Sequence, residues 1–306
     1  MGVEIRRATI NGENHSESGN TGAPVVLGLQ PFALVDHIAK VDWSLLSQIP
    51  GEPGGSFPVA VEELKHILNE LNAHILPSTD NESLLKTIAG GSVANTIRGL
   101  AAGFGISSGI IGACGDDEEG KLFMSNMGFY KVDLSRLRLK NGTTAQCVCL
   151  VDEVGNRTMR PCLSGSVKVQ VDELKREDFK GSKWLVLRYA ILNIEVIKAA
   201  IKIAKEEGLF VSLDLASFEF ARVPAIGEAK LTDATGAGDL FASGFLYGLV
   251  RGLSLEECCR VGSCSGGSVI RSLGGEVTPE NWQWMYKQMQ AKGLQLPELS
   301  KSAVVN

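Results

Sequence analysis

A carboxylate follows a glycine-rich turn at the start of a predicted helix in DATGAGD, residues 233–239. Gly236 and Gly238 let the backbone turn tightly, so that successive N–H groups of residues 236–239 point towards one place. Free N–H groups and the dipole at a helix N-terminus favour an anion. Phosphoryl transfer needs such a cradle, because negative charge spreads over the oxygens of the migrating group. Asp239 could take the proton of an attacking hydroxyl there, although spacing alone leaves open that it only caps the helix.

Other familiar kinds of site have little support. The four histidines lie in the first quarter of the chain, at spacings that match no metal motif: His15, His37, His66 and His74. This argues against a histidine-based zinc site or a Ser–His–Asp hydrolase. The segment GDDEEGKL (115–122) resembles a P-loop, but Leu122 stands where a magnesium-binding hydroxyl is needed, and its four successive carboxylates would repel a triphosphate. No G-x-G-x-x-G follows a predicted strand, so a Rossmann dinucleotide site is not expected.

The segment DATGAGD closely resembles the second signature of the pfkB (ribokinase-like) kinase family, usually D-T-x-G-A-G-D. The resemblance implies that Asp239 is the catalytic base. It also implies that the amides of Gly236, Ala237 and Gly238 form the anion hole. Asp233 and Thr235 would shape the loop and face the nucleotide phosphates and magnesium. The implied cofactors are therefore ATP and Mg²⁺, and no residue is assigned as a metal ligand.

An upstream segment, GGSVANT (90–96), resembles the family's G-G-x-x-x-N, in which the glycines and the asparagine contact sugar hydroxyls. By this resemblance Gly90, Gly91 and Asn95 bind substrate, and Asp36 matches an early aspartate that hydrogen-bonds the sugar. A buried carboxylate is a natural acceptor for a vicinal diol. The structural alternatives are a glycine pair that packs a helix, a capping Asn95 and a loop Asp36. The order and spacing of the motifs favour a shared sugar site over three separate explanations.

The elements that must position these residues alternate between strands and helices. We expect strands at residues 24–29, 107–114, 184–190 and 209–215, and helices at 61–71, 93–105, 118–128 and from Ile194 onward. Two further helices are expected to begin after Ser254 and Thr278. Such alternation predicts an α/β fold with a doubly wound, mainly parallel sheet, as in ribokinase-like proteins.

A small β lid is expected beside this sheet. Residues 143–162 alternate in polarity and turn at Gly155–Asn156, which indicates a hairpin. The resemblance makes this hairpin part of the lid, together with about 36–58, a stretch whose prolines and glycines indicate a loop. We expect a disordered leader at 1–22, one domain at 23–295 and a tail at 296–306.

The chain departs from the family between Asp214 and Asp233. Family members place two further strands there: one carries N-x-x-E, whose glutamate organises magnesium, and the other ends in a loop along the ATP. At about 30 residues per βαβ unit, roughly 60 to 80 residues are absent. The sequence therefore predicts an internal deletion, with its junction near Arg222–Val223.

The composition is that of an ordinary globular protein: 306 residues, 44% hydrophobic and 21% charged, with a formal net charge of −5. An acidic chain without basic runs is not expected to bind nucleic acid. Seven cysteines without a CxxC pair indicate reduced, mostly buried thiols. The polar first residues, and the lack of an apolar run of about 20 residues, predict a cytoplasmic protein without a membrane partner.

The resemblance implies ATP-dependent phosphorylation of a hydroxymethyl group on a sugar or nucleoside. A competing hypothesis is a non-catalytic sugar- or nucleoside-binding or regulatory relative that lost its nucleotide-binding segment. A third is another enzyme class built on an open α/β sheet. Because the deletion would expose apolar strand edges, a homodimer is also possible.

Overall fold

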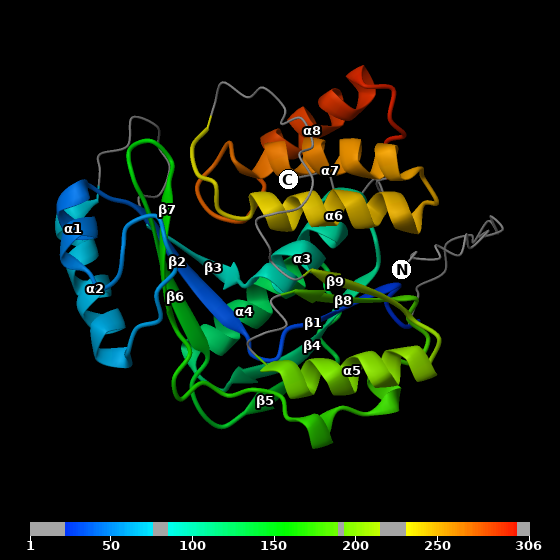
Figure 1. Cartoon of the computed structure of the whole chain (residues 1–306), viewed down its shortest axis with the longest axis horizontal. Coiled ribbons are helices and arrows are strands. Elements are labelled where there is room, and N and C mark those ends of the chain that lie inside the picture. The colour runs from blue at the N-terminus through cyan, green and yellow to red at the C-terminus, as the bar shows by residue number, and fades with distance from the viewer. Residues whose placement is uncertain (1–21, 76–84, 189–192, 215–230, 299–306) are drawn as a thin grey trace, which may run out of the picture.

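The computed structural model describes residues 22–75, 85–188, 193–214 and 231–298 (Figure 1). The predicted leader lies outside this part of the chain except for its last residue, as does the tail from residue 299 onward. The predicted deletion junction at Arg222–Val223 also lies outside the described residues.

The main sheet is parallel throughout, with strand order β5-β4-β1-β8-β9. Its strands are β1 (Val26–Leu29), β4 (Ser108–Gly115), β5 (Leu137–Lys140), β8 (Trp184–Arg188) and β9 (Phe210–Asp214). Helices cover both of its faces, namely α3 (Ser92–Phe104) and α4 (Glu118–Phe129) on one and α5 (Ile194–Glu206) on the other (Figure 1). In β1, Val26 packs with α3, whereas Leu27 and Leu29 pack with α5. The predicted doubly wound α/β fold is confirmed.

A second sheet lies beside the main one (Figure 1), with strand order β3-β2-β6-β7. Its strands are β2 (Leu34–Lys40), β3 (Leu85–Gly90), β6 (Ala145–Val151) and β7 (Arg157–Cys162). The central pair, β2 and β6, is parallel, and the outer pairs are antiparallel. The antiparallel β6–β7 pair confirms the predicted hairpin.

The expectation of a loop from residue 36 to 57 is wrong for its first half. This stretch contains most of β2 and helix α1 (Trp43–Gln48). Strand β2 is covered on both faces, so buried and exposed side chains do not alternate along it. Each of its residues is buried or half-buried. Helices α1 and α2 (Val61–His74) pack on the outer face, while Leu273 packs on the inner face. A strand buried on both sides lacks the period-2 pattern that would have revealed it.

Three C-terminal helices form a further layer: α6 (Ala237–Val250), α7 (Leu255–Val269) and α8 (Pro279–Ala291) (Figure 1). The predicted helix starts are confirmed, because Ser254 caps α7 and Thr278 caps α8. Two short 3₁₀ helices, Val171–Glu173 and Arg176–Asp178, precede β8. Among the described residues, every helix is too short or too polar to cross a bilayer.

Candidate active site

The loop before α6 is held rigidly by its own aspartate. One oxygen of the Asp233 carboxylate accepts hydrogen bonds from the backbone N–H (2.8 Å) and the hydroxyl (2.7 Å) of Thr235. The other accepts from the Gly274 N–H at 2.8 Å. Asp233 is fully buried, and its carboxylate bonds hold the shape of the loop.

Glycine is required at position 236 for two reasons. Gly236 is the N-cap of α6 and has φ of 80°, in the left-handed region that side chains disfavour. A Cβ atom there would also lie 2.9 Å from the Cα of Gly275. The turn leads directly into Ala237 and Gly238, the first two residues of α6. The N-terminus of a 14-residue helix is thus presented at this loop. The N–H of Ala237 already donates to the Ala234 carbonyl at 3.3 Å.

Asp239 lies in the first turn of α6, and its side chain is directed towards other elements. The Asn95 side-chain amide of α3 donates to its Oδ2 at 3.0 Å. The Nη2 of Arg188 lies 3.2 Å from its Oδ1. Because Gly236 is the N-cap, the alternative that Asp239 merely caps the helix does not hold. Asp239 is a buried carboxylate beside a helix N-terminus, with one neutral and one cationic donor.

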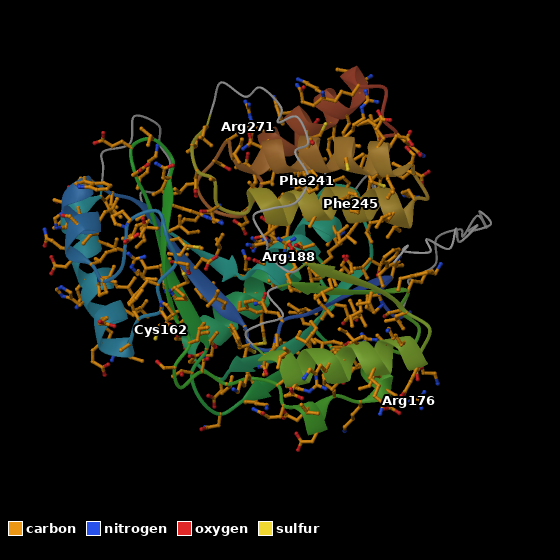
Figure 2. The ribbon with its side chains drawn as sticks, viewed as in Figure 1. Cys162, Arg176, Arg188, Phe241, Phe245 and Arg271 are labelled. Carbon is orange, nitrogen blue, oxygen red and sulfur yellow. The ribbon has the colours of Figure 1, made fainter. Side chains whose placement is uncertain are left out.

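Arg188 contacts Asp239 at the candidate site, and no motif in the sequence indicated it. It ends strand β8, is only 9% exposed, and also pairs with Asp214 Oδ2 at 2.9 Å. Figure 2 shows it in the middle of the molecule, between the main sheet and α6. One signal could have revealed it: a charged residue closes the apolar strand WLVLR (184–188), and ligands bind at the carboxyl ends of parallel strands.

Asn95 is itself held by a buried arginine. The Arg98 Nη2 donates to Asn95 Oδ1 at 2.7 Å and to the Gly275 carbonyl at 3.1 Å. Its Nη1 donates to the Ala89 carbonyl at 2.7 Å and to Asn126 Oδ1 at 2.9 Å. Arg98 therefore joins β3, α3, α4 and the segment before α8. The side-chain oxygen of Asn95 accepts from Arg98 and its N–H donates to Asp239, so the orientation of the Asn95 amide is fixed.

The glycine pair forms the turn from β3 into α3. Gln30, which follows β1, accepts from the Ala94 N–H at 3.0 Å and donates to the Gly90 carbonyl at 3.2 Å. Gly91 is the N-cap of α3. A Cβ atom on Gly90 would overlap the Asp36 carboxyl group, so this position must be glycine for Asp36 to lie where it does. The glycine motif indicated the two glycines, whereas no motif indicated Gln30.

Asp36 is buried in the second sheet, close enough to Asp239 for their charges to interact. Burial is the largest cause that raises the pKa of Asp36, Arg98 and Arg157 oppose it, the charges of Asp239 and Asp233 add to it, and the net pKa is about 7. Near neutral pH its carboxyl group therefore exists in both protonation states, so that it can accept or donate a hydrogen bond. The structure thus brings Asp36, Asn95 and Asp239 into one region.

The P-loop-like segment 115–122 has a structural role. Asp117 is the N-cap of α4 and accepts from the Gly120 N–H at 2.9 Å. The same carboxylate accepts from the Thr144 N–H at 2.7 Å and the Thr144 hydroxyl at 2.6 Å. These bonds tie α4 to the start of β6 in the second sheet.

The chemistry of the site fits a phosphate group better than a protein-bound magnesium ion. The α6 N-terminus favours an anion, whereas the charge of Arg188 is already balanced by Asp214 and Asp239. Within the described ranges, the one cluster of three possible metal ligands contains two thiols, which magnesium does not favour. Magnesium is commonly held by one or two carboxylates together with substrate phosphates, and Asp239 is the carboxylate beside the cradle.

Comparison with known proteins agrees with this geometry. The model of the pfkB family carbohydrate kinases matches residues 64–219 and 204–282. A fructokinase of Klebsiella pneumoniae is 29% identical over 48% of this chain and 49% of its own length. A nucleoside kinase of Methanocaldococcus jannaschii is 31% identical over 22% of each chain. The chain thus spans half or less of the length of these curated relatives.

The fold agrees as well. The crystal structure of adenosine kinase from Sinorhizobium meliloti superposes with a TM-score of 0.73 and 21% identity, over 88% of this chain and 99% of the other. This likeness shows a shared ribokinase-like fold. The family match, which extends over most of the chain, establishes that the protein belongs to the pfkB family of carbohydrate kinases.

Proposed function

We propose that the chain transfers the γ-phosphoryl group of ATP to a hydroxymethyl group of a sugar or nucleoside. The observation that carries this proposal is the buried Asp239 carboxylate beside the N–H cradle of α6, facing the region of Asp36 and Asn95. A general base must lie within hydrogen-bond reach of the hydroxyl that it deprotonates. The named relatives, which are a fructokinase and a nucleoside kinase, favour these two classes of substrate.

Each residue has a distinct part in the proposed reaction. Asp239 accepts the proton of the attacking hydroxymethyl group. The N–H groups of residues 236–239 stabilise the charge that develops on the phosphoryl oxygens. Arg188 holds Asp239 in place from one side, and Asn95 does so from the other. Asp36 binds substrate hydroxyls, and Asn95 contributes an N–H to the same region.

When bound, ATP with Mg²⁺ supplies the phosphoryl group and neutralises part of its charge. The second sheet is proposed to act as the lid that excludes water during transfer, with contributions from about 36–58 and 143–162. The main sheet, its helices and this lid would then make up one domain at 23–295.

A second candidate, a non-catalytic sugar- or nucleoside-binding relative, is favoured by one feature. Only residues 215–236 join β9 to α6, where we expect the family's two further strands. The family model also matches in two overlapping pieces, 64–219 and 204–282, as it would if a central part were absent. A chain without that part would keep the substrate residues but lose most nucleotide contacts.

A product assay separates these two functions. The chain is incubated with Mg·ATP and a panel of sugars and nucleosides, and phosphomonoesters are detected by mass spectrometry. Parallel thermal melts detect binding, because a ligand stabilises the folded state by RT ln(1 + [L]/Kd). ATP-dependent formation of a phosphomonoester is expected. Ligand-induced stabilisation without any phosphorylated product would favour the non-catalytic relative. The absence of both product and stabilisation would contradict both candidate functions.

A further inference from the structure

Two thiols and a carboxyl group meet on the inner face of the second sheet. Asp36 on β2 is the register partner of Cys147 on the adjacent β6, and Cys149 follows two residues later on the same face. The Sγ atoms of Cys147 and Cys149 are 3.7 Å apart, and one ligand atom from each of the three residues lies within 4.8 Å of the others. All three side chains are buried.

The separation of the thiols matches that of two thiolates on a tetrahedral zinc ion. With Zn–S bonds of about 2.3 Å, the tetrahedral angle places two sulfur ligands roughly 3.8 Å apart. The carboxylate oxygen of Asp36 would complete a third vertex after a shift on the order of 1 Å, since Zn–O bonds are about 2.0–2.2 Å. Two soft sulfur ligands select thiophilic cations over magnesium or calcium.

A disulfide between the thiols fits the backbone less well. Residues i and i+2 of a strand have Cα atoms roughly 6.6–6.8 Å apart, at the upper limit of about 6.8 Å for disulfides. Simple packing of two thiols in an apolar core is the other explanation, because free cysteine behaves as a small hydrophobic residue. Packing accounts for the two thiols, and the buried carboxyl group of Asp36 beside them adds a third possible ligand.

We infer that Asp36, Cys147 and Cys149 form a binding site for one zinc-class divalent cation, with its fourth position open to water or a small ligand. A cation bound there occupies the carboxylate that we propose for substrate hydroxyls. The cation and the sugar or nucleoside therefore compete for Asp36. This competition rests on the proposed function, whereas cation binding by the three residues does not.

The test is a titration of the full chain with Cd²⁺ in a buffer that contains a phosphine reductant. Binding is monitored by the ultraviolet charge-transfer absorption of cadmium thiolates. One Cd²⁺ per chain is expected. Cys147→Ala and Cys149→Ala each weaken binding by more than about 10-fold, the lower end of the effect of losing an outer-shell partner. The double variant abolishes the absorption at this site. Thermal melts confirm that each variant is folded, and the single variants suffice if the double variant does not fold.

Cys162→Ala is the matched control. Cys162 is also a buried thiol of the same hairpin, but it packs on the opposite face of the second sheet with helices α1 and α2 (Figure 2). Its replacement leaves Cd²⁺ binding unchanged. Equal Cd²⁺ binding by the wild type and by the Cys147→Ala and Cys149→Ala variants overturns the inference, as does the absence of thiolate absorption in the wild type.

Asp36→Asn separates this inference from the proposed function. The variant weakens Cd²⁺ binding and also ligand-induced stabilisation by the sugar or nucleoside, whereas the cysteine variants weaken Cd²⁺ binding alone. If Cd²⁺ binds as expected and no sugar or nucleoside binds, the metal site stands and the proposed function fails. Undiminished Cd²⁺ affinity in Asp36→Asn contradicts the assignment of Asp36 as a ligand.

Discussion

The Asp239 carboxylate is held by side chains of other elements, and Gly236 is the N-cap of its helix. An aspartate near a helix start is common, and its position alone fits both roles. Here Asn95 and Arg188 hold the two carboxylate oxygens from different elements. Both contacts join residues far apart in the sequence, so neither Arg188 nor the supporting Arg98 and Gln30 could be assigned from a local motif.

Arg188→Gln is expected to lower kcat by about 10²-fold, the cost of a small misplacement of a catalytic group. The substitution removes the cation that fixes Asp239 Oδ1, while KM for the sugar or nucleoside changes little. Steady-state kinetics with the identified substrate test this. Arg176→Gln is the control, because Arg176 is 61% exposed and pairs with Glu207 beside α5, away from the site (Figure 2). Equal kcat in the two variants would remove Arg188 from the positioning role.

Alanine at Asp36 or Asn95 is expected to weaken binding of the sugar or nucleoside by about 1–3 kcal/mol, the cost of leaving a buried polar group unpaired. The loss should be the same with and without ATP, since neither residue belongs to the phosphate cradle. Isothermal calorimetry measures it, with thermal melts to check folding. Unchanged affinity in both variants would place the substrate site elsewhere.

At the scale of elements, glycine motifs and regular periodicity predicted turns, helices and strands. Contacts between layers could not be predicted from the sequence. The turn before α3 and the turn before α6 follow from glycines whose neighbours leave no room for a side chain, at Gly90 and Gly236. The hairpin of β6 and β7 follows from its alternation. Strand β2 could not be recognised, because helices on one side and the segment around Leu273 on the other remove its alternation.

A contact between the second sheet and the C-terminal segment is expected to make the stability of the folded state depend on pH. Lys86 of β3 pairs with Glu276 at 3.0 Å, and Asn126 also donates to Glu276 at 2.7 Å. Burial acts to raise the pKa of Glu276, but Arg98, Lys86 and Asn126 together lower it below its usual value. A lowered carboxyl pKa contributes stability above the unfolded-state value of about 4.3, and this stability is lost as pH falls through the folded-state pKa.

Glu276→Gln should therefore lower the melting temperature at pH 7, and the difference from wild type should shrink as pH falls below about 4. Glu257→Gln is the control. Glu257 is an exposed carboxylate whose pKa is lowered by local helix-capping hydrogen bonds from Ser254. It should leave the contact between the second sheet and the C-terminal segment intact. A Glu276→Gln deficit that is constant from pH 3 to pH 7 would show that the charge of Glu276 contributes nothing.

At the scale of the whole molecule, the described part of the main sheet has an exposed edge. Strand β9 lies at its edge in the described part of the chain, and its Phe210 and Leu213 side chains are 48% and 42% exposed. An apolar edge strand invites pairing with another chain. This agrees with the proposed deletion after Asp214 and with a homodimer formed through that edge. The deletion hypothesis comes from comparison with the family pattern alone, because a deleted segment leaves no residue in the chain that could indicate it.

Insertion of the corresponding family segment at Arg222–Val223 is expected to raise ATP affinity, turnover and melting temperature, and to shift any dimer towards monomer. The inserted strands would cover β9 and supply nucleotide contacts. Calorimetry with ATP, kinetics and light scattering compare the two forms. If the 306-residue chain equals the restored chain in ATP affinity and turnover, the deletion hypothesis is wrong.

The most direct measurement is the rate of phosphoryl transfer by the wild-type chain and by Asp239→Asn, using γ-labelled ATP and the substrate found in the product assay. Asparagine keeps the size of the side chain but cannot accept the hydroxyl proton. We expect a slow but measurable wild-type rate and a kcat that is about 10²–10⁴-fold lower in the variant, the usual contribution of a positioned general base. Binding of the sugar or nucleoside should be almost unchanged. A variant that transfers phosphate as fast as wild type would contradict the assignment of Asp239 as the base on which the proposed function depends.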